Sequence, residues 1–195
     1  GLTLRIVKSP IKDKLETLYK LLGELKGESA LVFCNQRESV ERVSNYLTEM
    51  GVDNEYFHGG MEQPERERAL SLFRNGSASV FISTDLASRG LDIPEVKNVI
   101  HYHLPINEEA FIHRNGRTAR MNAEGDAFMI LNEVETVPEY ITREPDEFFL
   151  PEKAKKPLRS EWVTLTINRG KRDKLSKKDV VGFLFQKGGL EKEDL

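Results

Sequence analysis

The sequence has little of what marks secreted, membrane or metal-binding proteins. Cys34 is the one cysteine in 195 residues, which excludes an internal disulfide and a thiolate metal cluster. No apolar run approaches the roughly 18 residues that cross a membrane, and the N-terminus lacks the charged-then-apolar pattern of a secretion signal. We therefore expect a cytoplasmic protein with no membrane partner and no metal site, in which Cys34 is a small buried side chain.

Positive charge is scarce in most of the chain and concentrated near its end. Residues 1–152 contain 17 Lys and Arg against 26 Asp and Glu, whereas residues 153–178 contain ten against two. A basic stretch after an acidic body indicates an element that binds a polyanion such as nucleic acid, or a solvated linker. The chain starts with Gly1 and not Met, so we expect a piece of a longer protein.

Helix-like and strand-like segments alternate along the chain. The first helix is predicted over 10–25, with Ser9 as N-cap and Pro10 at the first helical position. Apolar strand patterns cover 30–35, 54–57, 79–84, 96–104 and 125–132, and helical patterns cover 37–50, 64–75 and a short stretch from 107. This alternation predicts an α/β fold with a parallel sheet covered by helices on both faces.

Small, polar and basic residues follow three of the expected strands, in "CNQR", "HGGMEQPER" and "TDLASRGLD". Ligands of such sheets bind beyond the carboxyl ends of the strands, where backbone N–H groups and helix dipoles favour phosphate oxygens. Singly, each has a simpler explanation: Gly59 and Gly60 as turn residues, Thr84 as a helix cap, Arg66 as a solvated side chain. Together they indicate a groove that follows a phosphate backbone.

The octapeptide "HRNGRTAR" holds three arginines and one histidine at positions 113–120. Arg117 and Arg120 are three apart, which on a helix places both guanidinium groups on one face. Such a pair can hold a phosphate bidentately and can stabilise the charge on a transferring γ-phosphoryl group. The alternative is a set of surface salt bridges to the acidic part of the chain.

The motifs "LVFCNQR", "HGGMEQPERERALSLF", "STDLASRGLDIPEV" and "HRNGRTAR" occur in this order. Over about residues 4–135 the chain resembles the second RecA-like domain of the DEAD-box RNA helicases. The resemblance implies a RecA-like, P-loop NTPase-like sheet and ATP-dependent RNA helicase activity. Asn115 stands where the family usually has an aliphatic residue, and Ala119 stands where glycine is usual; neither change removes a charged group.

The resemblance also implies roles at the nucleotide. Arg117 and Arg120 would reach the γ-phosphate of ATP, one of them as the arginine finger, and His113 would couple this clamp to the other domain. Asp92 would meet the ribose hydroxyl of ATP, with Gly90 giving the backbone room.

A second set of residues would contact RNA. The resemblance places along the sugar–phosphate backbone Asn35, Gly59, Gln63, Arg66 and Thr84, with Arg89 linking the RNA and nucleotide sites. Contacts to the backbone imply little sequence preference.

Two motifs of a complete helicase are missing: the phosphate loop "GxxxxGK[ST]" and an Asp-Glu-Ala-Asp tetrapeptide. We expect the N-terminal RecA-like domain of the same full-length protein to hold ATP and Mg²⁺, so that this piece alone is inactive. Its partners would be that domain and RNA. The alternatives are a non-enzymatic RNA-binding or scaffold fragment and a DNA-directed helicase of the same superfamily.

The end of the chain has a pattern of its own. "WVTLTIN" at 162–168 alternates like a strand, "RGKRDK" is a basic turn, and "SKKDVVGFLFQKGGL" is a helix capped by Ser176 and ended by Gly188. It resembles the first half of the RRM-like α+β RNA-binding domain of DbpA-type helicases, too short for a complete core. We expect domains at 1–135 and 159–195, a connection at 136–158, and structured, for example ribosomal, RNA as the target.

Overall fold

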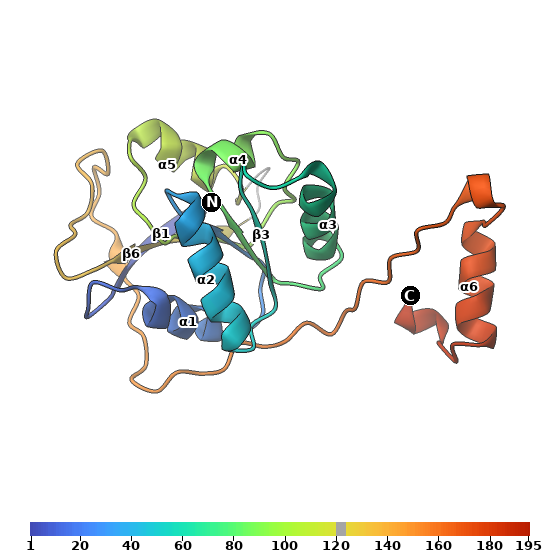
Figure 1. Cartoon of the computed structure of the whole chain (residues 1–195). Helices are drawn as coiled ribbons and strands as arrows, with labels where there is room; N and C mark the ends of the chain where they lie inside the picture. Colours follow the sequence, from blue (N-terminus) through green and yellow to red (C-terminus); the bar gives the residue numbers. More distant parts are fainter. Residues whose placement is uncertain (120–123) are drawn as a thin grey trace. The chain divides into compact units, whose positions relative to one another are not determined.

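The computed structural model describes residues 1–119 and 124–195 and divides the chain into two compact units, Gly1–Val163 and Thr164–Leu195. The first unit contains one seven-stranded sheet in the order β3-β4-β2-β5-β6-β1-β7 (Figure 1). All six strand pairs are parallel. This confirms the predicted α/β fold with a parallel sheet.

The bounds of the elements follow the predicted alternation closely. The strands are β1 (Leu2–Lys8), β2 (Ala30–Phe33), β3 (Asn54–Phe57), β4 (Val80–Ser83), β5 (Asn98–His101), β6 (Gly125–Leu131) and β7 (Asp146–Glu147). The helices are α1 (Leu15–Glu24), α2 (Arg37–Glu49), α3 (Gln63–Arg74), α4 (Asp85–Arg89), α5 (Glu108–Asn115) and α6 (Lys177–Gln186), with single 3-10 turns at Lys171–Asp173 and Lys192–Asp194. No helix in the described parts of the chain is long and apolar enough to cross a membrane.

The core lies on both faces of the sheet, because successive side chains of a strand point to opposite sides. In β2, Ala30 and Val32 join the cluster that contains α1 and α2, and Leu31 and Phe33 join the cluster that contains α3 and α4. Phe111 of α5 packs with Met129 and Leu131 of β6 in a third cluster. Helices therefore cover both faces, which explains why the strands read as continuous apolar runs.

The first helix begins later than predicted. It starts at Leu15, with Lys14 as its N-cap residue, and residues 10–12 are bends. Ser9 is no cap: its hydroxyl donates to the carbonyls of Ile11 and Asp13 and accepts from Thr17. These local bonds compete with helical pairing, so the Ser-Pro pair begins a turn in place of a helix.

Residues 136–158, the expected connection, contact the sheet. β7 pairs with β1, the N–H of Phe148 donates to the carbonyl of Ile6 at 2.8 Å, and Ala154 packs against the α1 side of the core. β1 and β7 were not predicted. The domain division at 135 and 158 stays a prediction, although the compact unit extends to Val163.

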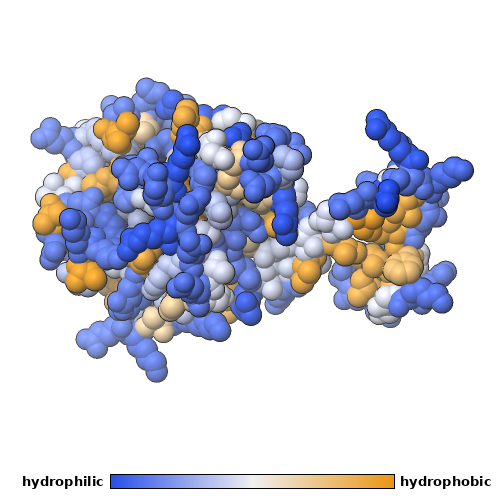
Figure 2. Space-filling model, in the orientation of Figure 1, coloured by the Kyte–Doolittle hydropathy of each residue, from blue (hydrophilic) through white to orange (hydrophobic). Residues whose placement is uncertain are grey.

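The second unit consists of α6 and two 3-10 turns. Ser176 caps α6 as predicted, and its hydroxyl accepts from the N–H of Asp179 at 3.3 Å. The expected strand over 162–168 is wrong, because these described residues pair with no strand. Apolar side chains remain at the surface of this unit (orange in Figure 2). About 32 residues bury too little area to form a core.

Candidate functional site

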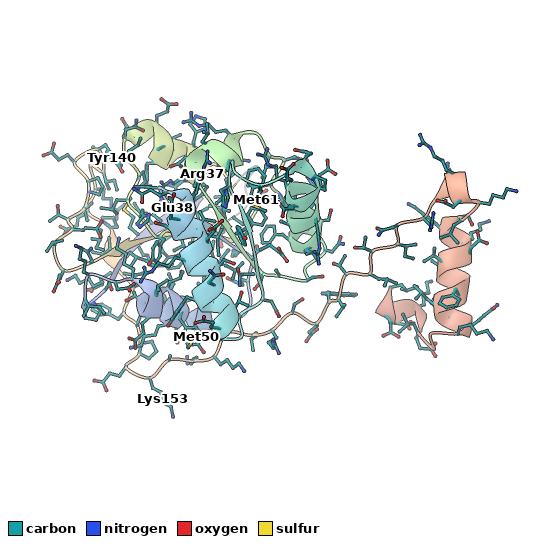
Figure 3. The ribbon with its side chains drawn as sticks, viewed as in Figure 1. Arg37, Glu38, Met50, Met61, Tyr140 and Lys153 are labelled. Atoms are coloured by element: carbon teal, nitrogen blue, oxygen red, sulfur yellow. The ribbon has the colours of Figure 1, made fainter. Side chains whose placement is uncertain are left out.

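The carboxyl ends of the strands form one edge of the sheet, which we call the rim: residues 34–37, 58–66, 84–92 and 102–119. Because β2, β3, β4 and β5 are parallel, the loops that follow them meet there. Figure 3 shows Arg37 and Met61 at the same end of the domain, where α2 and α3 begin. The structure thus brings the four quoted motifs together.

Arg114 is the centre of the rim. Its guanidinium is fully buried and binds both carboxylate oxygens of Asp85 at 2.7 Å. It also donates to the Asn35 side chain and to the carbonyl of His103, each at 2.7 Å, and lies 5.1 Å from the ring centroid of Phe33. Bidentate, charge-assisted bonds offset the cost of burying this charge. One side chain therefore joins the ends of β2, β4 and β5.

Sequence reasoning missed Arg114 and its partner Asp85 as site-forming residues. A signal was present, since Arg114 follows the buried Ala110 by four residues and Phe111 by three, which places it on the inner face of α5. A charge on the inner face of a helix requires a buried partner.

Asn35 and Thr84 lie at the ends of two adjacent strands. The N–H of Asn35 donates to Nδ1 of His103 at 3.0 Å, and its side chain donates to the carbonyl of Leu104 at 3.1 Å. The hydroxyl of Thr84 accepts from the N–H of Ala87 at 3.3 Å and caps α4. Thr84 is a helix cap, as the simpler explanation held, and lies on the rim as well.

Arg117 lies beyond the helix that was expected to carry it. α5 ends at Asn115, and the Arg117 guanidinium donates to the carbonyl of Ser88 at 2.8 Å and to that of Leu91 at 3.5 Å. The prediction of a shared helical face for Arg117 and Arg120 is therefore wrong for Arg117, and Arg120 lies outside the described residues. Gly116 ends the helix, which turns Arg117 toward α4.

The loop held by Arg117 carries two of the expected nucleotide residues. A Cβ on Gly90 would meet no atom within 4 Å, so this backbone is open to a ligand. The Asp92 side chain is 99% exposed, with Arg74 3.1 Å from its carboxylate. His113 is 55% exposed and lies 3.9 Å from Glu109, which also pairs with Arg89 at 3.3 Å.

The two glycines after β3 are held by the half-buried Arg66 and the buried His58. Arg66 donates to the carbonyls of Gly59 at 3.1 Å and Met61 at 2.8 Å, with its guanidinium 5.0 Å from the ring centroid of Phe57. Nδ1 of His58 accepts from the N–H of Gly60 at 3.1 Å. Arg66 is thus no merely solvated residue, because it shapes the glycine loop.

Two further side chains, those of Gln63 and Arg37, lie near the glycine loop. Gln63 is exposed and donates to Glu67 at 3.2 Å along the surface of α3. The Arg37 guanidinium, which sequence reasoning did not select, would lie 3.6 Å from a Cβ on Gly59. The glycines therefore keep backbone exposed beside a fixed positive charge.

Burial controls protonation beneath the rim. It lowers the pKa of His101 to about 3 and that of His103 to about 4, with Arg114 adding to both shifts, so both rings are neutral at pH 7. His101 shares a 2.9 Å hydrogen bond with Asn115. Burial raises the pKa of the Cys34 thiol to about 12, which makes it a packing group and no nucleophile.

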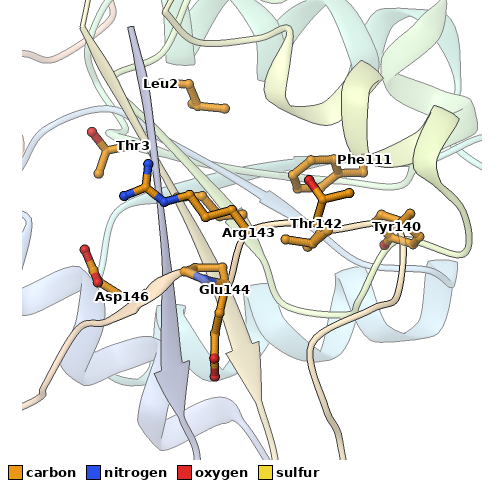
Figure 4. Close-up of a pocket in the computed structure, with 11 residues that line it drawn as sticks. Leu2, Thr3, Phe111, Tyr140, Thr142, Arg143, Glu144 and Asp146 are labelled. Atoms are coloured by element: carbon orange, nitrogen blue, oxygen red, sulfur yellow. The ribbon is translucent and has the colours of Figure 1, made fainter.

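A cavity of about 460 Å³ lies between the start of β1, Phe111 of α5 and residues 140–146, and no predicted site residue lines it (Figure 4). Within residues 1–119 and 124–195, no group of three or more His, Cys, Asp or Glu side chains could hold a metal ion.

Comparison with known proteins assigns this architecture to a family. Residues 13–122 match the helicase conserved C-terminal domain, and residues 164–195 match the DbpA RNA binding domain. The chain therefore belongs to the helicase conserved C-terminal domain family. Its neighbours in structure and sequence are the C-terminal domains of DEAD-box RNA helicases, which confirms the predicted RecA-like fold.

Three relatives illustrate the match. The Escherichia coli (strain K12) ATP-dependent RNA helicase DbpA is 34% identical over 190 residues, 94% of this chain and 42% of that protein. The Kluyveromyces lactis ATP-dependent rRNA helicase RRP3 is 37% identical over 131 residues, 67% of this chain and 26% of that protein. The structure of the E. coli DEAD-box protein SrmB bound to regulator of ribonuclease activity A has a TM-score of 0.68 and 29% identity, over 84% of this chain and 99% of that chain. This chain spans less than half the length of the two helicases.

Proposed function

We propose that this chain is the C-terminal half of an ATP-dependent DEAD-box RNA helicase. It binds the RNA backbone and supplies arginines for ATP hydrolysis, while a first RecA-like domain of the same protein holds ATP and Mg²⁺. The observation that carries the proposal is the convergence of the four motifs on one rim, where Arg114 of the last motif bonds Asn35 of the first, Asp85 of the third and the chain at His103.

On the nucleotide side, the bonds of Arg117 to the loop at 88–91 support the proposal. They hold the loop that carries Gly90 and Asp92, the expected ribose contacts. Arg117, with Arg120, would then stabilise the charge on the γ-phosphate when the two domains close. His113 is exposed and able to reach the other domain in that state.

On the RNA side, Asn35, Gly59 and Thr84 end three neighbouring strands, and Gln63 opens the adjacent helix. Backbone N–H groups, a helix N-terminus and the arginines at 66 and 89 together fit a sugar–phosphate chain and carry no sequence code. This arrangement favours RNA binding that depends on backbone shape.

The most specific part of the proposal concerns the RNA target. One relative is named as an rRNA helicase, and residues 164–195 match the DbpA RNA binding domain. We therefore infer that the protein remodels structured RNA, with ribosomal RNA as the first candidate, in the cytoplasm.

The test is Arg117→Lys and, separately, Arg120→Lys in the full-length protein. Lysine cannot reproduce the planar two-pronged grip, so RNA-stimulated ATP turnover is expected to fall by up to about 10³-fold. RNA affinity without nucleotide should be unchanged. Arg143→Lys, an exposed arginine away from the rim, is the matched control. Near-normal turnover in both Arg117→Lys and Arg120→Lys contradicts the proposal, as does a loss confined to thermal stability.

A further inference from the structure

The segment that follows β7 packs closely on the helices of the first unit, to which it belongs. Residues 151–162, which we call the strap, run past the C-terminal ends of α1 and α2 (orange trace in Figure 1). Its contacts reach from α1 through α2 to α3, although it forms no regular secondary structure. Sequence reasoning took most of this segment for a connection.

The contact with α1 depends on a glycine inside the helix. A Cβ on Gly23 would overlap the carbonyl oxygen of Lys155, so only glycine allows the strap to lie this close. The Lys155 ammonium also pairs with Glu24 at 3.2 Å. Glycine weakens a helix interior, so its presence here is explained by the close approach of the strap.

The contacts with α2 and α3 are hydrogen bonds and glycine contacts at the ends of the helices. Asp53, which follows α2, accepts from the N–H of Ser160 at 3.2 Å. The Ser160 hydroxyl donates to the carbonyl of Gly76, which follows α3, and Trp162 lies beside the same glycine. The last residues of the strap are therefore fixed beside the end of α3.

We propose that the C-terminal ends of α1, α2 and α3 form a docking surface for residues 151–162, and that docking shortens the free tether of residues 164–195. The expected effect on RNA affinity rests on the proposed function, whereas the docking of residues 151–162 on the helix ends does not. Release of the strap would add about twelve flexible residues, with a span of about 20 Å. Effective concentration falls with roughly the −3/2 power of tether length, so RNA that contacts both units should bind about three- to tenfold more weakly.

Gly23→Ala in the full-length protein tests this inference. Alanine is the better helix former, so α1 is retained, while its methyl group displaces the strap. We expect faster hydrogen exchange at Ser160 and faster proteolysis within 151–162. The Kd for a hairpin RNA with a single-stranded extension should rise about three- to tenfold, with ATP turnover at saturating RNA unchanged. Asn45→Ala, at an exposed position of α2, is the matched control, because alanine is the better helix former there too.

Asp53→Ala provides a second route to release of the strap, with Glu49→Ala, an exposed acid at the end of α2, as its control. Unchanged exchange at Ser160 in both Gly23→Ala and Asp53→Ala overturns the docking surface. Release of the strap with unchanged RNA affinity overturns its tethering role. A wild-type protein without RNA-stimulated ATP turnover overturns the proposed function instead, and leaves the exchange result to decide the docking.

Discussion

The two units each contain a ten-residue helix with apolar side chains, but these side chains are buried in α1 and largely exposed in α6. In α1, Leu18 and Leu21 are fully buried, whereas in α6, Phe183 is 64% exposed and Val181 and Phe185 are each 38% exposed. Every buried hydrophobic residue in the described parts of the chain lies in Gly1–Val163. Apolar side chains at helical spacing therefore form a core only where a second layer covers them.

The physical reason for this difference is the apolar surface area that each unit offers for packing. A seven-stranded sheet presents two apolar faces, each wide enough for two or more helices, and the strand register aligns their side chains. Thr164–Leu195 has one helix and two single turns, and a segment of this size exposes most of its surface.

The units also differ in charge. Residues 1–163 have an excess of acidic side chains, whereas residues 164–195 contain eight Lys and Arg against five Asp and Glu. In the first unit the arginines of the rim are held by defined partners, as Arg114 is by Asp85. In the second unit most basic side chains are exposed, which suits attraction to a polyanion more than precise positioning.

The largest expected effect is the loss of the buried ion pair. Arg114→Ala leaves the Asp85 carboxylate and the Asn35 side chain without their shared donor, and should lower the free energy of unfolding of the first unit by about 3–5 kcal/mol. Urea unfolding followed by circular dichroism measures this. Phe183→Ala in the second unit, where no core exists, should cost about 0.5 kcal/mol or less.

Two controls sharpen that contrast. Arg143→Ala removes an exposed arginine from the same unit and should change stability by less than about 0.5 kcal/mol. A loss below about 1 kcal/mol for Arg114→Ala would mean that the rim does not depend on this side chain.

A smaller effect is expected from removal of residues 164–195. RNA affinity should fall about ten- to hundredfold, while the melting temperature of the first unit stays the same, because no buried hydrophobic residue is removed. The slope of log K against log salt should flatten by about 0.7 for each phosphate that the shortened chain no longer neutralises. Filter binding across a salt series measures both. Replacement of Lys171, Arg172 and Lys174 by Gln should flatten the slope by about 2 without truncation; an unchanged slope refutes the electrostatic role.

The last expected effect is a pH dependence confined to the first unit. Burial lowers the pKa of His101 from 6.5 to about 3, so between these values the unfolded chain binds a proton that the folded chain does not. The contribution of His101 to the free energy of unfolding is complete above pH 6.5 and is lost as pH falls toward 3. The slope is up to about 1.4 kcal/mol per pH unit. Unfolding of wild type and His101→Asn between about pH 4 and 7 measures the difference. His113→Gln, at an exposed histidine, should follow wild type; equal slopes for wild type and His101→Asn contradict this assignment.

Much of the first unit was predictable because local patterns coincide with the final contacts. The bounds of α2 and α3 and the positions of β2, β3 and β4 were expected within a few residues, since apolar periodicity and the glycine after α2 define them locally. The start of α1 was not, because the bonds of Ser9 depend on Thr17 eight residues away. The prediction of a strand at 162–168 was wrong for a related reason. Alternating apolar residues favour a strand, but a strand forms only where another strand is available to pair with it.

The candidate site likewise has features that the sequence predicts and features that depend on the tertiary structure. Sequence alone determined which loops meet, because parallel strands place their carboxyl ends at one edge and the quoted motifs follow those strands. Only the tertiary structure decided what each side chain does there. Arg114 binds Asp85 across 29 residues and Asn35 across 79, and Arg117 leaves its helix to bond the loop at Ser88. Gly23 makes room for the carbonyl of Lys155, far along the chain, and this approach exists only once the strap has crossed α1. Such contacts form between surfaces that folding brings together, so no local pattern encodes them.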